Sequence, residues 1–202
     1  TDKQVWGLAI DNKSRIWLGG ENEIAVFSAD MKLQKILSLT AKASPHTHAS
    51  VIFKDKKGTI WLGLYKDGIL TCNPYTEEIT RIEMEDKRAD ICCFYEENNK
   101  IWIGTQNGLY SYENGKIVEE KEINEQLPDI MIHGIQRDRQ GKLWLGTFGK
   151  GLIVFSPEGK RIMRFDTSNG MESNAVNALY IDSEGNLWAA TRAGIVHISD
   201  TS

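Results

Sequence analysis

Short, mainly apolar runs of about five residues recur along the chain. The pattern is clearest over residues 131–137, 143–147, 152–156 and 161–165, which are separated by clusters rich in Gly, Asn, Asp and Ser. The alternation over residues 131–137 and the short apolar runs that follow it predict β-strands, and the clusters between them predict tight turns. No stretch shows the 3.6-residue period of an amphipathic helix. The pattern therefore predicts antiparallel meanders of four short strands, without helices.

One frame around tryptophan occurs five times. Five of the six tryptophans, spaced 44, 41, 42 and 44 residues apart, are Trp17, Trp61, Trp102, Trp144 and Trp188. An acid stands six residues before each of them, Asp in four repeats and Glu96 in the third. A Gly follows two residues after each of the first four. A fixed period of this size is the signature of a repeat architecture, so each repeat is predicted to be one four-stranded sheet.

A single four-stranded sheet cannot bury both of its faces, but sheets stacked around an axis can. This predicts an all-β fold, a β-propeller, with blades at residues 5–40, 49–83, 90–124, 131–166 and 175–199. The repeated Trp is the expected wedge between blades, since burying about 200 Å² is worth at most about 5 kcal/mol. The last blade lacks its outer strand, so we expect a piece of a larger propeller, whose exposed edges would also allow a homodimer.

Composition narrows the possible partners and cofactors. The formal net charge of −4 provides no basic surface for nucleic acid. The sequence contains no run of about 18 apolar residues that would cross a membrane. Cys72, Cys92 and Cys93 lack the spacing of a zinc site or a disulfide framework, and we expect them to pack as small apolar side chains. We therefore predict no cofactor and no metal.

Catalytic motifs are absent from the sequence. On a strand, the spacing of His46 and His48 would place both imidazoles on one face, but a polar loop is favoured over a metal site. His197 is expected to be structural, and residues 118–122 are expected to form a solvated outer strand. The acids before each Trp are expected to form turns, because an Asp side chain accepts backbone N–H groups. No EF-hand, phosphate loop or nucleophile elbow occurs, so no catalytic residue is predicted.

A binding face can be predicted from strand order alone. In a four-stranded meander, the turns between strands one and two and between strands three and four lie at one end. That end is uniform among the repeats, whereas the opposite end varies and mixes aromatic, amide and charged groups, which suits a polar ligand such as a sugar. The ligand-binding candidates at the variable end are His48, Tyr65, Lys66, Arg88, Asp90, Gln106, Asn107, His133, Phe148, Lys150, Asn174 and Arg192.

The frame Asp-x-x-Gly-x-(Ile/Leu)-Trp-(Leu/Ile)-Gly-Thr followed by Gly-Leu, as at residues 138–152, resembles the two-component regulator propeller repeat. Residues 173–176 match the lead-in of that repeat, whereas Glu96, Ser14, Asn99 and the pair 189–190 depart from it. The resemblance implies seven-bladed propellers, usually two in tandem, in the periplasmic sensor half of hybrid two-component proteins of gut anaerobes. It implies an inner-membrane protein that detects oligosaccharides released from glycans and signals through further sensor domains to a histidine kinase.

Other resemblances leave alternatives open. Residues 138–144 also resemble the docking motif of quinoprotein dehydrogenases, and streptogramin lyases are similar in architecture. The Asp turns resemble the sialidase Asp-box, but the preceding Ser is missing. Three hypotheses follow: a sensor propeller that binds an oligosaccharide without catalysis, a scaffold that dimerises or docks a partner, and a propeller enzyme of the lyase or quinone-dependent dehydrogenase type. The first is favoured.

Overall fold

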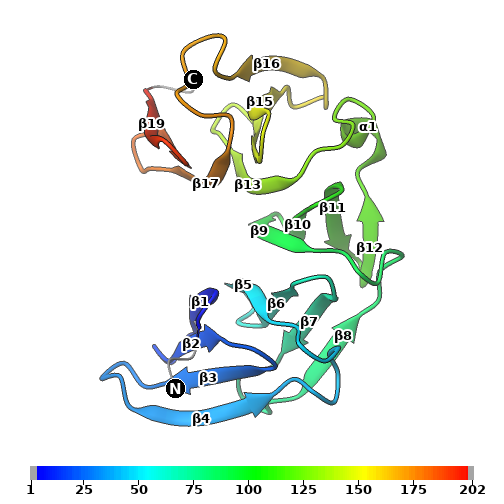
Figure 1. Cartoon of the computed structure of the whole chain (residues 1–202), viewed down its shortest axis with the longest axis vertical. Helices are drawn as coiled ribbons and strands as arrows, with labels where there is room; N and C mark the ends of the chain where they lie inside the picture. Colours follow the sequence, from blue (N-terminus) through cyan, green and yellow to red (C-terminus); the bar gives the residue numbers. More distant parts are fainter. Residues whose placement is uncertain (1–3, 200–202) are drawn as a thin grey trace. The chain divides into compact units, whose positions relative to one another are not determined.

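The computed structural model describes residues 4–199, whose strands form five antiparallel sheets (Figure 1). The first sheet contains β1 (Gly7–Ile10), β2 (Ile16–Gly19), β3 (Glu23–Phe27) and β4 (Leu33–Ser38), and the second contains β5 (Ala49–Lys54), β6 (Ile60–Leu64), β7 (Gly68–Cys72) and β8 (Ile79–Ile82). Within each sheet, strands adjacent in sequence are neighbours. This order is the predicted meander.

The remaining sheets follow the same order. The third contains β9 (Ile91–Glu97), β10 (Lys100–Thr105), β11 (Gly108–Glu113) and β12 (Lys116–Glu119). The fourth contains β13 (Ile132–Arg137), β14 (Leu143–Thr147), β15 (Gly151–Phe155) and β16 (Arg161–Phe165), and the fifth contains three strands, β17 (Val176–Ile181), β18 (Leu187–Thr191) and β19 (Gly194–Ile198). Two compact units result: residues 4–91 with 114–117, and residues 92–113 with 118–199.

Asp138 illustrates how the turn between the first two strands of a sheet is built. Its Oδ1 accepts hydrogen bonds from the backbone N–H groups of Gln140 (3.0 Å) and Lys142 (2.9 Å), and Gly141 takes a positive φ of 80°. Asp11 and Asp182 accept the same pair of backbone bonds. A short carboxylate that satisfies two backbone donors stabilises a tight turn, so the turn-forming role predicted for these acids is confirmed.

The same carboxylates also hold the repeated indoles, which the sequence reasoning missed. Oδ2 of the Asp accepts a hydrogen bond from the Trp Nε1–H six residues later, at 2.9–3.0 Å, in four pairs: Asp11–Trp17, Asp55–Trp61, Asp138–Trp144 and Asp182–Trp188. Because an indole donor is costly to bury unpaired, this bond allows the ring to enter the core. Each Asp therefore links a turn to the packing of its own sheet.

The third sheet lacks this bond. Glu96 replaces the Asp, and Trp102 Nε1 is buried without a hydrogen-bond partner. Here β9 continues to Glu97 and β10 begins at Lys100, so the turn contains two residues, Asn98 and Asn99, both with positive φ. Two left-handed residues give a type I′ hairpin, which Asn tolerates. The departures from the frame at Glu96 and Asn99 thus produce a shorter turn.

Three of the repeated indoles pack against the neighbouring sheet of the same unit. Trp17 is 1% exposed and belongs to a core cluster with Ile52 and Leu62 of the second sheet. Trp144, which is 4% exposed, clusters with Val176 and Leu187 of the fifth sheet. Trp61 and Trp102 are also buried. The predicted wedge role is therefore confirmed for Trp17, Trp102 and Trp144, since Trp102 clusters with Ile135 and Leu143 of the fourth sheet, and for Trp61 the structure shows burial.

The Gly two residues after the Trp permits this close packing. A Cβ added at Gly146 would lie 2.7 Å from Val176 Cγ1, and one added at Gly19 would lie 2.6 Å from the Ala49 carbonyl oxygen. Both neighbours belong to the first strand of the next sheet. A side chain there would push the sheets apart, which explains the recurrent Gly.

Two predictions were wrong. Trp188 is 40% exposed, because it lies on the last sheet of residues 4–199 and no further sheet of that range covers its ring. A helical turn, α1 (Lys121–Asn124), follows β12. The sequence had predicted an outer strand over residues 118–122 and no helix. The Asn124 side chain holds this turn on β11, since its Oδ1 accepts from Leu109 N–H (2.8 Å) and its Nδ2 donates to Leu109 O (3.0 Å).

Candidate functional site

In the first unit, two predicted residues meet where β5 begins and β6 ends. His48 precedes β5 and Tyr65 follows β6. Tyr65 N–H donates to the His48 carbonyl at 3.0 Å, and Thr47 Oγ1 donates to the Tyr65 carbonyl at 3.0 Å. The backbone ladder of the sheet thus fixes both side chains at the variable end.

Their rings form a row with a third ring that was not predicted. The His48 ring stacks on Trp6, with centroids 4.1 Å apart and an interplanar angle of 23°, and on Tyr65, at 5.0 Å and 12°. We call Trp6, His48 and Tyr65 the aromatic row. Trp6 is 36% exposed and Tyr65 is 40% exposed, so ring surface remains available to solvent. The available signal for Trp6 was that it alone among the six tryptophans lies outside the repeated frame.

Charged groups flank the aromatic row. The Lys66 ammonium lies 5.0 Å from the centroid of the Tyr65 ring. Half-burial raises the pKa of Asp90, and the Lys66 charge partly offsets that effect. Burial also lowers the pKa of His48 despite the opposing influence of Glu21, so the stacked imidazole is neutral at neutral pH. The row therefore combines apolar ring faces with one cation and one carboxylate, the mixture that binds polar, ring-shaped ligands.

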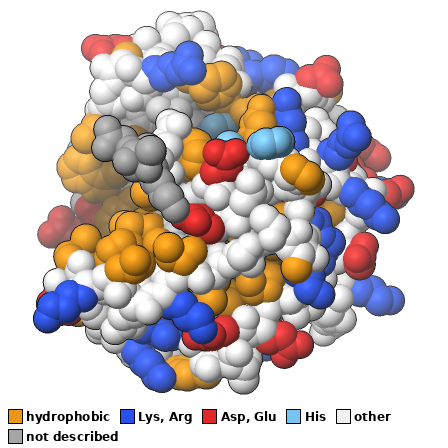
Figure 2. All heavy atoms as spheres, turned by 60° about the horizontal axis from the view of Figure 1, so that its bottom comes forward, with side chains coloured by type: hydrophobic (Ala, Val, Ile, Leu, Met, Phe, Trp, Pro, Cys, Tyr) orange, Lys and Arg blue, Asp and Glu red, His pale blue; other side chains and the backbone are white. Residues whose placement is uncertain are grey.

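A second group of predicted residues meets in the second unit. Phe148, which follows β14 and is 39% exposed, stacks on His133 with centroids 5.5 Å apart. The Arg192 guanidinium carbon lies 4.6 Å from the Phe148 ring centroid. Burial lowers the pKa of His133, whose Nε2 is buried without a hydrogen-bond partner. On the face drawn in Figure 2, hydrophobic side chains (orange) form several patches among charged ones (blue and red).

The other candidates are arranged less favourably for binding. Lys150 Nζ donates to the Pro128 carbonyl at 2.9 Å, and the Asn174 amide bonds to Thr167, so local structure already uses both side chains. Arg88 and Asn107 are exposed, and Gln106 is half-buried. For these residues ligand contact stays a prediction.

The structure gives no support for a metal site at the histidine pair. His46 Nδ1 lies 3.4 Å from Glu21 Oε1, whereas His48 is in the aromatic row. No group of three His, Cys, Asp or Glu side chains placed to hold an ion occurs within residues 4–199. Burial raises the pKa of the Cys72 thiol to about 11, consistent with a packing role. No helix in that same range is long and apolar enough to span a membrane.

Comparison with known proteins identifies the repeat. The family "Two component regulator propeller" matches residues 126–149 and 170–193, which contain the first two strands of the fourth and fifth sheets. Histidine kinase P4 from Formosa agariphila is 26% identical over 163 residues, which make up 71% of this chain and 12% of that protein.

Solved structures extend the likeness to the whole chain. The extracellular domain of a hybrid two-component system from B. thetaiotaomicron is 28% identical with a TM-score of 0.83, and the match covers 100% of this chain and 27% of that one. Virginiamycin B lyase from Staphylococcus aureus is 16% identical with a TM-score of 0.72, over 100% of this chain and 71% of the lyase, a likeness that shows the fold alone. Repeats, packed sheets and solved structures together identify the chain as an all-β propeller, of which residues 126–149 and 170–193 match the two-component regulator propeller repeat.

Proposed function

We propose that this propeller is part of the extracytoplasmic sensor of a two-component system and that it binds oligosaccharides without chemically altering them. The likeness to an extracellular domain of a hybrid system supports the sensing role and the location. The chain spans only 12–27% of the matched histidine kinase and extracellular domain, so the transmembrane signal would pass through parts of the protein outside this chain.

The aromatic row is the observation that carries the ligand class. Pyranose rings present apolar C–H faces that pack on exposed aromatic rings, while their hydroxyl groups need charged or polar partners nearby. Trp6 and Tyr65 provide the rings, and Lys66 and Asp90 provide a donor and an acceptor. All lie at the variable end, where loops can change without disturbing the Asp–Trp bonds at the other end.

Calorimetric titration of the chain with a panel of neutral and acidic oligosaccharides tests this proposal. Tyr65→Ala should weaken binding about fivefold or more, because truncating an aromatic side chain on which a ligand packs commonly costs more than about 1 kcal/mol. Tyr75→Ala is the matched control, because Tyr75 is 57% exposed and lies in the β7–β8 turn at the uniform end. If the chain binds none of the sugars in the panel, the proposal is refuted. If Tyr65→Ala and Tyr75→Ala weaken binding equally, the aromatic row is not the binding site.

A further inference from the structure

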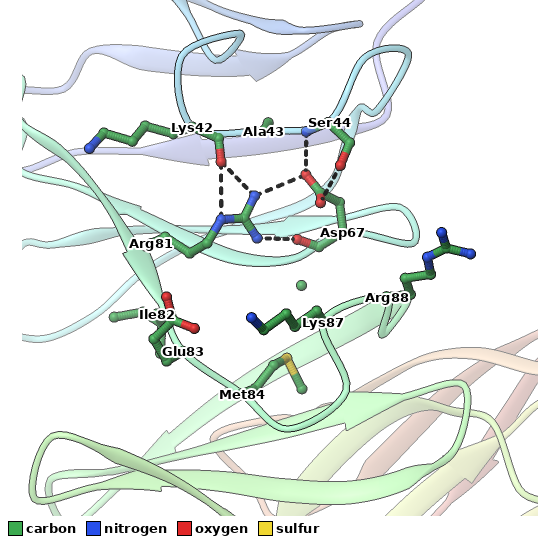
Figure 3. Close-up of a pocket in the computed structure, with 11 residues that line it drawn as sticks. Lys42, Ala43, Ser44, Asp67, Arg81, Ile82, Glu83, Met84, Lys87 and Arg88 are labelled. Carbon is green, nitrogen blue, oxygen red and sulfur yellow. Dashed lines mark hydrogen bonds and ion pairs between the residues drawn. The ribbon is translucent and has the colours of Figure 1, made fainter.

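A cavity of about 390 Å³ opens in the first unit. Its walls come from the segment before β5, the β6–β7 turn, the end of β8 and the connection that leads to β9. The charged residues that line it are Lys42, Asp67, Arg81, Glu83, Lys87 and Arg88 (Figure 3). Among the ligand-binding candidates predicted from sequence, only Arg88 belongs to this cavity.

One wall of the cavity is rigid and electrically balanced. Asp67 is 6% exposed and accepts hydrogen bonds from Ser44 N–H (2.8 Å) and Ser44 Oγ (2.7 Å). The Arg81 guanidinium donates to Asp67 Oδ2 (3.1 Å) and to the Asp67 carbonyl (2.8 Å), and its Nε donates to the Lys42 carbonyl (3.0 Å), as drawn in Figure 3. Asp67 and Arg81 therefore neutralise each other and shape the wall, so the net charge of the cavity depends on the remaining charged residues.

Those remaining charges are mainly positive. Lys42, Lys87 and Arg88 stand against one carboxylate, Glu83, in a chain whose formal net charge is −4. Within residues 4–199 none of the three cations forms an ion pair. In Figure 3, Lys87 extends toward the space beneath Arg81, whereas Lys42 and Arg88 extend outward. A cavity with a local excess of flexible cations attracts an anionic group and can bind it through charge-assisted hydrogen bonds.

The cavity and the aromatic row share the same backbone connections. Asp67 lies two residues after Tyr65 in the β6–β7 turn, and Arg88 lies two residues before Asp90. We propose that the cavity binds an anionic substituent, a carboxylate or a sulfate, of an acidic oligosaccharide whose sugar rings pack on Trp6 and Tyr65. This inference rests on the proposed function, because it specifies which oligosaccharides the variable end selects.

The test uses small probes and backbone amide NMR of the ¹⁵N-labelled chain. Methyl β-glucuronide and inorganic sulfate represent the two anion sources, and uncharged methyl β-glucoside is the control probe. Either anion should shift the amides of Ser44, Gly68 and Lys87, whereas the glucoside should leave them in place. The double variant Lys87→Gln/Arg88→Gln should weaken anion binding at least tenfold. Lys57→Gln, which removes an exposed charge in the β5–β6 turn, should leave it unchanged.

The outcomes separate the two proposals. If glucoside shifts the Trp6 indole signal but neither anion shifts the cavity amides, the anion site is refuted and the proposed function stands. The inference is also refuted if the double variant binds both anions as tightly as the native chain. Shifts from glucuronide alone assign a carboxylate, and shifts from sulfate alone assign a sulfate. If no probe shifts either region and the oligosaccharide panel also fails, both proposals are refuted.

Discussion

Replacing Asp138 by Ala tests the double role of the repeated aspartate. The substitution removes the acceptor of two backbone N–H groups and of Trp144 Nε1–H, all within 3.0 Å of the carboxylate. Asp138 is 6% exposed and Trp144 is 4% exposed, so water cannot readily replace the lost acceptor at the indole. Hydrogen bonds to charged groups contribute roughly 1.5–3 kcal/mol each, and an unpaired buried donor costs a further ~1–3 kcal/mol. Since such effects are not additive, we expect a loss of about 3–5 kcal/mol.

Asp182→Ala is the matched control. Asp182 forms the same three bonds, but Trp188 is 40% exposed, so its indole N–H can turn to water when the carboxylate is lost. The loss of stability should therefore be clearly smaller. Urea unfolding followed by tryptophan fluorescence, with the slope compared among variants, measures both effects. Equal losses of unfolding free energy for the two variants would refute the reasoning. A loss below about 0.5 kcal/mol for Asp138→Ala would also refute it, since ordinary surface substitutions change stability by that much.

Three further predictions concern stability. Gly146→Ala should destabilise the chain by roughly 1–3 kcal/mol in urea unfolding, because the new Cβ would lie 2.7 Å from Val176; an unchanged midpoint would contradict close sheet packing. Trp102→Phe should cost less than Trp144→Phe, because the Trp102 N–H has no partner to lose; the reverse order would be incompatible with this account. Burial lowers the pKa of His133, so its contribution to stability is present above the unfolded value of 6.5 and is lost as pH falls. Between about pH 7 and 5, the urea midpoint of the native chain should therefore fall more than the urea midpoint of the His133→Phe variant. If the two midpoints fall equally with pH, His133 does not cause the pH dependence of stability.

The scaffold was predictable because its determinants are local and repeated. An Asp in the turn, a Trp that packs between sheets and a Gly recur at fixed spacing, and their repetition shows that the pattern is not a coincidence. The bounds of β14 and β16 agree with the predicted runs. The turn α1 was missed because four residues are too few for a helical period, and a long-range bond from Asn124 holds it. The exposure of Trp188 depends on whether a neighbouring sheet covers its ring, and the residues around a single Trp do not encode that contact. The expected total of seven blades stays a prediction.

The candidate site was predictable only in part. Strand order placed His48, Tyr65 and Lys66 at one end, because residues that flank a hairpin ladder must meet. The contribution of Trp6 depends on packing between two sheets, and no spacing rule reports that contact. The cavity was missed for a similar reason, since its wall joins Ser44, Asp67 and Arg81 from three separate connections and strands. Sequence thus indicates which end varies among the repeats, and tertiary contacts determine which side chains lie together there.

Hydroxyl-radical footprinting with and without the best-binding oligosaccharide tests the central claim most directly, since it reports the exposure of each ring. We predict that Trp17, Trp61 and Trp144 remain unreactive in both states, because the repeated sheets bury them. Trp6 and Tyr65 should react in the free chain and become protected when the sugar binds, whereas Trp188 should react equally in both states. A reactive indole at Trp17, Trp61 or Trp144, or protection of Trp188 without protection of Trp6 and Tyr65, would contradict the account.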